Sequence, residues 1–240
     1  MRRAVRRRLD RFLPKPLSHQ VVEHLESSDV LHRRRRAVGV TALAGAGLLG
    51  ASLSTRPGSR SFYVSTGAVA GVWAVGSLVS GPLHLGWIES RDSTLRRPVL
   101  TPIATGVGAF GFFYGAALVA RRIPVLETAL SRVLVFADEG DDRLVLLTTL
   151  ANGVGEELFF RGALYAALGD RGPVAGSTAV YMLATSTTRN PALVLAAMVM
   201  GSLFGLQRRA SGGIQAPTIT HLTWSTLMLR YLPPLIRARR

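Results

Sequence analysis

The stretch Asn152-Gly-Val-Gly-Glu156-Glu157-Leu-Phe-Phe-Arg161-Gly162 decides what this chain can be. It places two adjacent carboxylates and one arginine in sequence that is apolar on both sides. In a helix, Glu157 and Arg161 are four residues apart and close enough to form an ion pair. Glu156 points about 100° around the helix from Glu157, so Arg161 cannot serve both carboxylates equally.

Three ionisable groups within six residues are a costly feature for a membrane segment. Each ionised group costs at least about 2.5 kcal/mol at the centre of a transmembrane helix. An ionisable cluster in such a segment therefore indicates a functional site. The alternative is an ion-paired helix end at the membrane interface, without a chemical role.

The rest of the chain has the composition of a polytopic membrane protein. The 240 residues have a mean hydropathy of +0.28, and the apolar residues gather in long blocks with arginines between them. The absence of Cys excludes disulfides and thiol catalysis. The net charge is +15, and the anionic lipids of a membrane leaflet are the expected partner. Nucleic acid is not expected, because the aromatic residues do not interleave with the basic runs.

Charge and hydropathy divide the chain into four regions. Residues 1–36 form a basic cytoplasmic or interfacial arm, which is amphipathic and suited to an anionic leaflet. Residues 37–143 hold N-terminal transmembrane helices and a surface loop. Residues 144–232 hold a helical core, and residues 233–240 are a basic tail that follows Pro233-Pro234. The run Arg33–Arg36 predicts a multi-pass protein of the cell membrane with a cytoplasmic N-terminus.

The predicted fold is an all-α transmembrane helix bundle with about seven spans (six to eight). Gly67xxxGly71 and Gly111xxxGly115 are typical of helices that pack closely. If seven spans cross the membrane alternately from a cytoplasmic N-terminus, the basic tail lies outside, although basic segments favour the cytoplasmic side. One span is therefore expected to be miscounted, re-entrant or half-length. The apolar blocks are 37–54, 62–85, 99–120, 144–168, 174–188, 192–206 and 214–232, and an amphipathic surface helix is predicted over 125–136.

A second unusual polar group is His221, in Pro217-Thr-Ile-Thr-His221-Leu-Thr-Trp-Ser225. A histidine in hydrocarbon needs a partner, and the Glu pair is the best candidate in the chain. A Glu–His pair in a dry pocket can hold a water, remove its proton and present it to a carbonyl. A neighbouring hydroxyl or imidazole N–H could stabilise the oxyanion that forms. The alternative is a histidine that only hydrogen-bonds a helix carbonyl.

These motifs resemble those of the CPBP intramembrane proteases, also called the Abi or CAAX-protease family. Glu156-Glu157-Leu-Phe-Phe-Arg161 matches the EExxxR signature of that family. The glycine-rich stretch Gly201–Gly205, the basic-glycine turn after it and the Ala216-Pro217 pair lead to His221, as in the last two helices of the family. The resemblance covers about residues 144–232.

The resemblance implies an intramembrane endopeptidase that cuts a peptide bond near the membrane interface. Glu156 would be the general base, Glu157 and Arg161 would support it, and His221 would help to hold a metal or an oxyanion. Family members are described both as metalloproteases and as glutamate-dependent proteases. Their substrates include prenylated CAAX proteins, which lose their last three residues, and bacterial peptides, so a peptide or membrane-protein substrate is expected.

Two departures from the family pattern bear on activity. The family has a middle FxxxH motif, whereas the nearest match here is Tyr181-Met-Leu-Ala-Thr185, and Ser225 stands where the last motif has Asn. The implied cofactor is a divalent metal, zinc, with Glu156 and His221 as its ligands. A single imidazole is a poor start for such a site. Ser225 could still donate to an oxyanion.

Two other functions remain open on the sequence. One is a catalytically inactive family member that acts as a membrane scaffold, an immunity factor or a peptide-binding protein. The other is a small transporter, which would also place charges at mid-membrane. The chain shows no internal repeat and no paired half-helices, which transporters of that kind commonly have.

Overall fold

The computed structural model describes Pro14, Leu17, residues 26–89 and residues 94–237. Most of the predicted basic arm and the last residues of the tail lie outside this part of the chain. The described part is all-α apart from one short antiparallel pair of strands. The helices are α3 (Ser28–Ser52), α4 (Arg60–Ser80), α5 (Leu100–Ala120), α6 (Pro124–Asp138), α7 (Asp142–Glu156), the π-helix η1 (Glu157–Ala163), α8 (Leu164–Leu168), α9 (Pro173–Ser186), α10 (Pro191–Ser211) and α11 (Gln215–Arg237), and the strands are β1 (Ile88–Glu89) and β2 (Leu95–Arg96).

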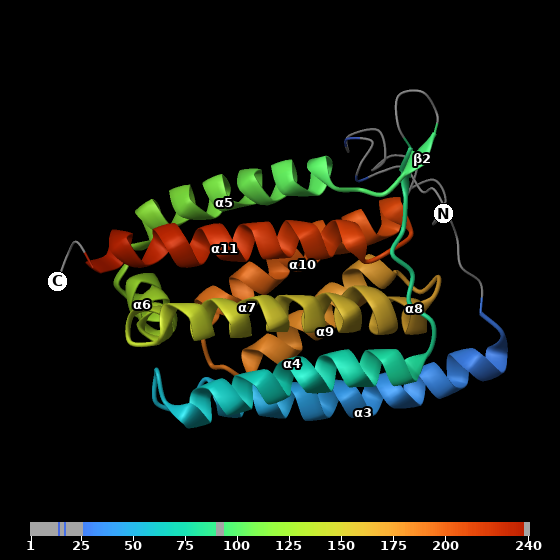
Figure 1. The fold of residues 1–240 in the computed structure, drawn as a ribbon, viewed down its shortest axis with the longest axis horizontal. Helices are drawn as coiled ribbons and strands as arrows, with labels where there is room; N and C mark the ends of the chain where they lie inside the picture. The colour runs from blue at the N-terminus through green and yellow to red at the C-terminus, as the bar shows by residue number, and fades with distance from the viewer. Residues whose placement is uncertain (1–13, 15–16, 18–25, 90–93, 238–240) are drawn as a thin grey trace.

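Most of the helices run along one common direction and form a bundle (Figure 1). Helices α7, η1 and α8 join into one continuous rod through the middle of it. The pair α3–α4 lies on one side of this rod, and α11 with α5 lies on the other. The short helix α6 lies across one end of the bundle, and the strands lie at the opposite end.

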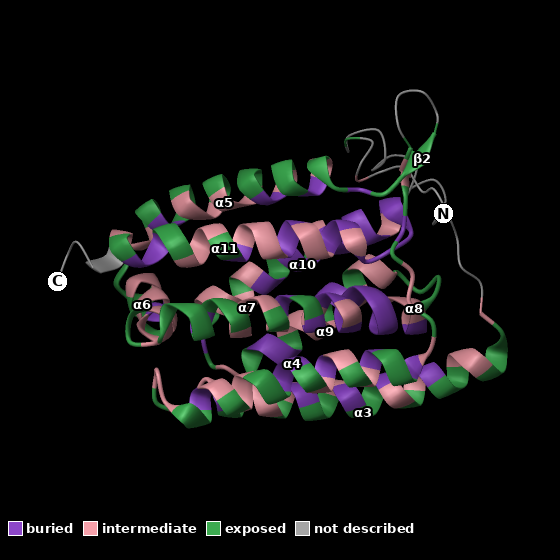
Figure 2. Ribbon diagram, viewed as in Figure 1, coloured by how far each residue is buried: buried purple, intermediate pink, exposed green. Residues whose placement is uncertain are grey.

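Three helices, α4, α5 and α10, are long and apolar enough to cross a membrane. Helix α5 is the most exposed of them, as Figure 2 shows, and its outer surface carries large apolar side chains such as Leu100 and Phe112. An apolar surface of this kind is suited to lipid. The chain is therefore a multi-pass helical membrane protein, and the sequence-based count of about seven spans remains a prediction.

The helix boundaries follow the apolar blocks of the sequence, but several ends differ. Helix α4 ends at Ser80, before the end of the 62–85 block, and α10 continues to Ser211, beyond the 192–206 block. Helix α3 begins at Ser28, well before Ala37, and takes the run Arg33–Arg36 into its first turns. Helix α11 continues through Pro233 and Pro234 to Arg237, although the sequence predicted that these prolines end it. Each proline removes one i→i−4 hydrogen bond and crowds the carbonyl four residues earlier, so the two prolines weaken only the last turns of α11, which ends at Arg237.

The early start of α3 is explained by the surroundings of Arg34, whose side chain is fully buried. Its guanidinium forms an ion pair with Glu26 and donates hydrogen bonds to Ser80 Oγ (3.1 Å) and to the carbonyl of Pro82 (2.9 Å). A buried charge is tolerated when it is paired and hydrogen-bonded in this way. Nearby, burial lowers the pKa of His84, and the positive charges of Arg208 and Arg34 lower it further against the opposing effect of Glu26.

The glycine motifs that predicted close packing face open space in this structure. A Cβ at Gly67 or Gly111 would meet no atom within 4 Å, and the same holds for their motif partners. Close helix approach occurs instead at Gly45 against Trp73 and at Gly106 against Thr223. The prediction from the GxxxG spacing was therefore wrong within this chain, because spacing does not say which face of a helix meets its neighbour.

The segment after α4 is held against the turn that joins α10 to α11. The N–H of Trp87 donates to the carbonyl of Ser211 (2.8 Å), and the N–H of Ile214 donates to the carbonyl of His84 (2.9 Å). The two backbones approach so closely that a Cβ on Gly213 would overlap the backbone of Leu85. This contact fixes the beginning of α11, the helix that carries His221.

Replacing Gly213 with Ala is expected to destabilise the protein by about 1–3 kcal/mol, the cost of forcing an extra methyl group into packed structure. The obstacle is backbone and cannot rotate away. Thermal unfolding in detergent would measure the loss. Gly108→Ala is the matched control, because a Cβ at Gly108 would meet no atom within 4 Å. Equal melting temperatures for the two variants would contradict the close approach of Gly213 to the backbone of Leu85.

Candidate active site

The two carboxylates lie where the α-helix α7 changes into the π-helix η1. Glu156 is the last residue of α7, and Glu157 is the first residue of η1. A π-helical turn is rare and is frequent at functional sites. This turn is enclosed on all sides, because Phe159 and Phe160 are both fully buried, with ring centroids 4.6 and 5.1 Å from the Trp73 ring.

Glu157 is the centre of a buried charged network. Its Oε1 lies 3.3 Å from Nη1 of Arg161 and 2.9 Å from Nδ1 of His221. The Glu157 and Arg161 side chains are fully buried, and the His221 ring stacks on Phe204 at a centroid distance of 4.9 Å. The structure therefore brings His221 of α11 to the Glu pair, and the carboxylate that it contacts is that of Glu157.

Arg161 is held by aromatic rings as much as by hydrogen bonds. Its Cζ lies 5.7, 4.8 and 5.1 Å from the ring centroids of Phe160, Tyr181 and Phe204. Within the described residues, its Nε and Nη2 have no hydrogen-bond partner. Cation–π attraction compensates in part for those bonds, and it is strongest where water is excluded. The carbonyl of Arg161 accepts a hydrogen bond from Nε of Arg208 (2.8 Å), which ties α10 to η1.

Glu156 has a different environment from its neighbour. Its Oε2 accepts a hydrogen bond from the Tyr181 hydroxyl (2.6 Å), and among the described residues the hydrogen bond of the His221 ring goes to Glu157 and not to Glu156. Its Oε1 accepts no hydrogen bond from the part of the chain that the structure describes. The two carboxylates thus have separate partners, and Arg161 serves only Glu157, as the angle between adjacent helical residues requires.

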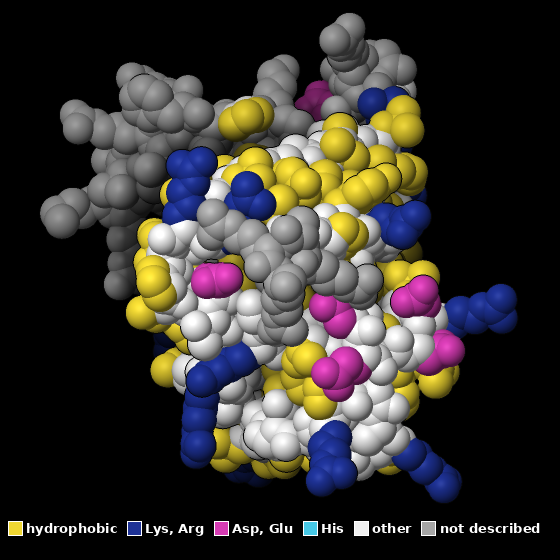
Figure 3. Space-filling view, turned by 90° about the vertical axis from the view of Figure 1, so that its left-hand side faces the viewer, with side chains coloured by type: hydrophobic (Ala, Val, Ile, Leu, Met, Phe, Trp, Pro, Cys, Tyr) yellow, Lys and Arg dark blue, Asp and Glu magenta, His cyan; other side chains and the backbone are white. Residues whose placement is uncertain are grey.

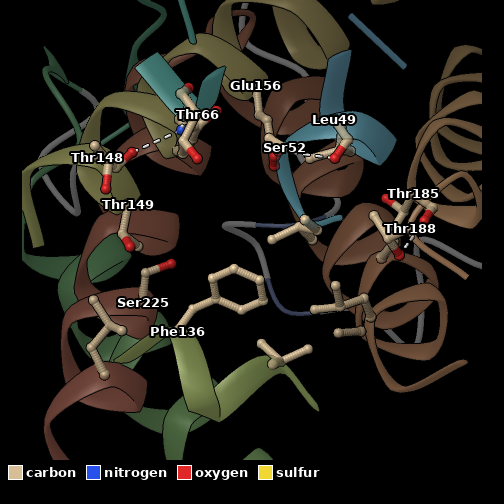
Figure 4. Close-up of a pocket in the computed structure, with 18 of the residues that line it drawn as sticks. Leu49, Ser52, Thr66, Phe136, Thr148, Thr149, Glu156, Thr185, Thr188 and Ser225 are labelled. Carbon is tan, nitrogen blue, oxygen red and sulfur yellow. Dashed lines mark hydrogen bonds between the residues drawn. The ribbon is translucent and has the colours of Figure 1, made fainter. Parts of the chain in front are cut away.

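Glu156 opens onto a cavity of about 280 Å³. Figure 4 shows Glu156 on one side of it and Phe136 of α6 on the other, with Ser225 and Thr149 facing Thr185 and Thr188 across the space between. His221 also lines the cavity, whereas Glu157 and Arg161 do not. The residues with polar side chains that line it from α7, α9, the α9–α10 turn and α11 are Thr148, Thr149, Asn152, Glu156, Tyr181, Thr185, Thr188, His221, Trp224 and Ser225.

The side chains present do not fit a zinc site of the kind that the resemblance implies. In the described part of the chain, no three His, Cys, Asp or Glu side chains come together. Thr185, the nearest match in this chain to the middle histidine of the family, donates its hydroxyl to the carbonyl of Tyr181 (2.8 Å). The Nδ1 of His221 is engaged with Glu157. Zinc prefers at least three nitrogen, sulfur or carboxylate ligands, so hydroxyls are a poor substitute.

Two residues of this site were not singled out by the sequence reasoning. Tyr181 was noted only as part of an imperfect FxxxH match, yet it holds Glu156. Arg208 was assigned to a basic turn, yet it is buried and lies over the Tyr165 ring at 4.9 Å. Arg208 lies between the apolar blocks 192–206 and 214–232, so local hydropathy does not mark it as buried. Nothing in the local sequence marks Tyr181 as a partner of Glu156.

Comparison with known proteins agrees with this arrangement. Residues 143–227 match the family model described as type II CAAX prenyl endopeptidase Rce1-like. Neither a curated protein nor a solved structure matches the chain. The matched residues run from the start of α7 to the middle of α11 and include Glu156, Glu157, Arg161 and His221. Residues 143–227 therefore form an Rce1-like type II CAAX prenyl endopeptidase family domain.

Proposed function

We propose that this protein is an intramembrane endopeptidase that hydrolyses a peptide bond in the 280 Å³ cavity, with Glu156 as the general base. One observation carries the proposal. Glu156 faces a cavity beside a histidine, whereas Glu157 is sealed away from it and paired. A carboxylate with a free oxygen in a cavity lined by few charges can take a proton from a water molecule.

The chemistry requires one water molecule and a peptide carbonyl in the cavity. Glu156 accepts a proton from the water while the water oxygen bonds to the carbonyl carbon, and the carbonyl electrons move onto its oxygen. The hydroxyl of Ser225 stabilises this oxyanion, as does Nε2–H of His221 when the ring carries a second proton, because Nδ1–H is donated to Glu157. The carbon–nitrogen bond then breaks, and Glu156 passes its proton to the leaving amine nitrogen.

The other charged residues position this machinery. Glu157 binds Nδ1 of His221, which fixes the orientation of the ring and leaves Nε2 as the remaining ring nitrogen. Arg161 balances the charge of Glu157 in a region without water. The Tyr181 hydroxyl donates to Oε2 of Glu156 and so fixes the orientation of this carboxylate, which leaves Oε1 of Glu156 available to water.

Peptide cleavage in liposomes tests the proposal. The purified protein would be reconstituted and incubated with peptides of varied sequence, and new termini would be identified by mass spectrometry. Cleavage that Glu156→Gln abolishes supports the proposal. Absence of cleavage for every peptide, combined with specific binding of one of them, would favour a second function.

That second function is a peptide-binding member of the family without hydrolytic activity. The feature in its favour is that the nearest match to the middle histidine is Thr185, a residue that cannot act as a base near neutral pH. In that case the same cavity would hold a peptide segment through its hydroxyls and Glu156. Binding would then be weakened by Glu156→Gln although no cleavage is measured.

Removal of metal ions is expected to leave cleavage unchanged, because the donor set does not fit zinc. Dialysis against a chelator followed by the peptide assay measures this, and elemental analysis of the protein before dialysis is expected to find less than one zinc per chain. Thr185→His, which adds an imidazole to the cavity wall beside His221, is the matched variant and is expected to raise the zinc content. Cleavage that chelation removes and zinc alone restores would overturn the expectation.

A further inference from the structure

The side chain of Asn152, on the cavity wall, has an acceptor oxygen that no described residue binds. We propose that Asn152 is a substrate-binding residue, whose Oδ1 accepts a hydrogen bond from a backbone N–H of a polypeptide in the cavity. The identity of the ligand as a polypeptide rests on the proposed function. The unpaired oxygen rests on the geometry alone.

The amide of Asn152 has a fixed orientation. Its Nδ2 donates to the carbonyl of Thr66 in α4 (3.0 Å) and to the carbonyl of Thr148 in α7 (2.9 Å), and Figure 4 shows these two threonines on one wall of the cavity. A primary amide has two N–H donors, so both are used. The opposite orientation would turn Oδ1 towards two carbonyl oxygens, which cannot donate to it. Oδ1 is therefore the atom that remains for a ligand.

Two more buried polar atoms of the cavity wall have no partner among the described residues. They are Oγ1 of Thr66, whose carbonyl already binds Asn152, and Nε1 of Trp224 in α11. By contrast, the hydroxyls of Thr148 and Thr185 each donate to the carbonyl four residues earlier (2.8 Å in both cases). Buried polar atoms without partners are few in native proteins, so a group of them on one cavity indicates a missing ligand.

The unpaired atoms match the chemistry of a polypeptide backbone. Oδ1 of Asn152 only accepts, Nε1 of Trp224 only donates, and a threonine hydroxyl does both. A peptide group carries one N–H donor and one C=O acceptor, so a backbone in the cavity can satisfy both kinds of atom.

The charge of the cavity wall also favours an uncharged ligand. Figure 3, which views the bundle from the α6 end, shows basic and acidic side chains on the outer surface. Of the described residues that line the cavity, none is Lys or Arg, and Glu156 is the one carboxylate. A ligand that carried a negative charge would find no cation here, whereas peptide groups need only hydrogen bonds.

The distance from Asn152 to Glu156 indicates which peptide group is bound. The two residues are four apart on one face of α7, and both line the cavity. Four residues of α-helix rise about 6 Å. An extended polypeptide advances about 3.3 Å per residue, so the same distance covers about two of its residues. The N–H bound by Asn152 is therefore expected about two residues from the bond that is cleaved beside Glu156.

The hydrogen bonds of Nδ2 also give Asn152 a structural role, because one of them ties α7 to α4. That role depends on Nδ2, whereas the proposed role depends on Oδ1. A purely structural Asn152 would affect the stability of the protein but would not respond to the removal of a single N–H from a bound peptide.

Peptides in which one backbone N–H at a time is replaced by an ester oxygen test the proposal. The starting peptide is one that the reconstituted protein cleaves or binds, and the Kd is measured by equilibrium binding in liposomes. Where cleavage occurs, Glu156→Gln is introduced into every protein compared, so that only binding is measured. One ester, about two residues from the cleaved bond, is expected to weaken binding about tenfold, as the loss of one hydrogen bond does.

Asn152→Leu, which has a similar shape but no acceptor, is the matched variant. It is expected to bind the starting peptide and that ester peptide equally, because both changes remove the same hydrogen bond. Thr148→Val is the control and is expected to keep the tenfold difference, because the Thr148 hydroxyl is paired within α7. Asn152→Asp, which keeps an acceptor oxygen and lacks the N–H groups, is expected to keep the difference as well and serves if Asn152→Leu does not fold.

An ester effect of the same size in Asn152→Leu, or its loss in Asn152→Asp, would overturn the proposal. Equal affinity for all the ester peptides would also overturn it, because the partner of Oδ1 would then be water. Cleavage without any ester effect would leave the proposed hydrolysis standing. An ester effect that depends on Asn152, in a protein that never cleaves, would support the binding role and contradict hydrolysis alone. Absence of both binding and cleavage for every peptide would overturn both.

Discussion

Replacing Glu156 with glutamine is expected to lower the rate of peptide cleavage by about 10²–10⁴-fold, the usual contribution of a positioned general base. Glutamine has the same shape, but its amide cannot accept a proton from water near neutral pH. The change leaves the hydrogen bonds of Glu157 to Arg161 and to His221 in place, since Glu156 takes part in neither of these two bonds. The measurement is the initial rate of cleavage in liposomes at saturating and at low peptide concentration.

Tyr181→Phe is the matched control for this variant. It keeps the carboxylate and removes the hydrogen bond to Oε2, so the rate is expected to fall by about tenfold, which corresponds to 1.4 kcal/mol. Both variants should melt near the parent temperature, because the cavity wall loses no packed volume. If Glu156→Gln cleaved at the parental rate, Glu156 would not be the base, and the His221–Glu157 pair would be the remaining candidate for that role.

The helical framework was largely predictable because hydropathy is a local property of the sequence. The apolar blocks at 99–120 and 192–206 correspond to α5 and α10, and the amphipathic segment at 125–136 corresponds to α6. The exceptions are segments whose helix boundaries or burial depend on contacts with residues far away in the sequence. Arg34 is helical and buried because Glu26, Ser80 and Pro82 surround it, which no window of sequence around Arg33–Arg36 reveals.

The candidate site was predictable as a set of residues and not as a set of contacts. The cost of buried charge indicated that His221 must meet the Glu pair, and the structure places it 2.9 Å from Glu157. Which of the two carboxylates meets His221 depends on how α11 packs against α7 and η1, and that packing has no signature in the local sequence. Likewise, Tyr181 reaches Glu156 only because α9 packs against η1.

This division between the carboxylates explains how one motif can serve both stability and chemistry. Glu157 is fully buried with a cation and an imidazole, so its charge is balanced and held in place. Glu156 lines the cavity, where a water molecule or a peptide can approach it. The stability of the site should therefore depend on Glu157 and Arg161, and its reactivity should depend on Glu156.

Arg161→Met is accordingly expected to destabilise the protein by about 3–5 kcal/mol, the cost of leaving a buried charge without its partner. Methionine fills a similar apolar space between Phe160, Tyr181 and Phe204 but leaves Glu157 with His221 alone. Thermal unfolding in detergent, followed by circular dichroism, would measure the change. Arg161→Lys retains the charge but not the planar guanidinium that stacks on the rings, so an intermediate loss is expected.

The double variant Glu157→Gln with Arg161→Met separates charge from packing. If the loss in Arg161→Met comes from the unpaired carboxylate, removal of that carboxylate should recover part of the stability, and the two changes should be non-additive by about 1 kcal/mol or more. If the two losses simply add, the ion pair contributes nothing specific, and the Arg161 side chain acts through its contacts with the rings of Phe160, Tyr181 and Phe204.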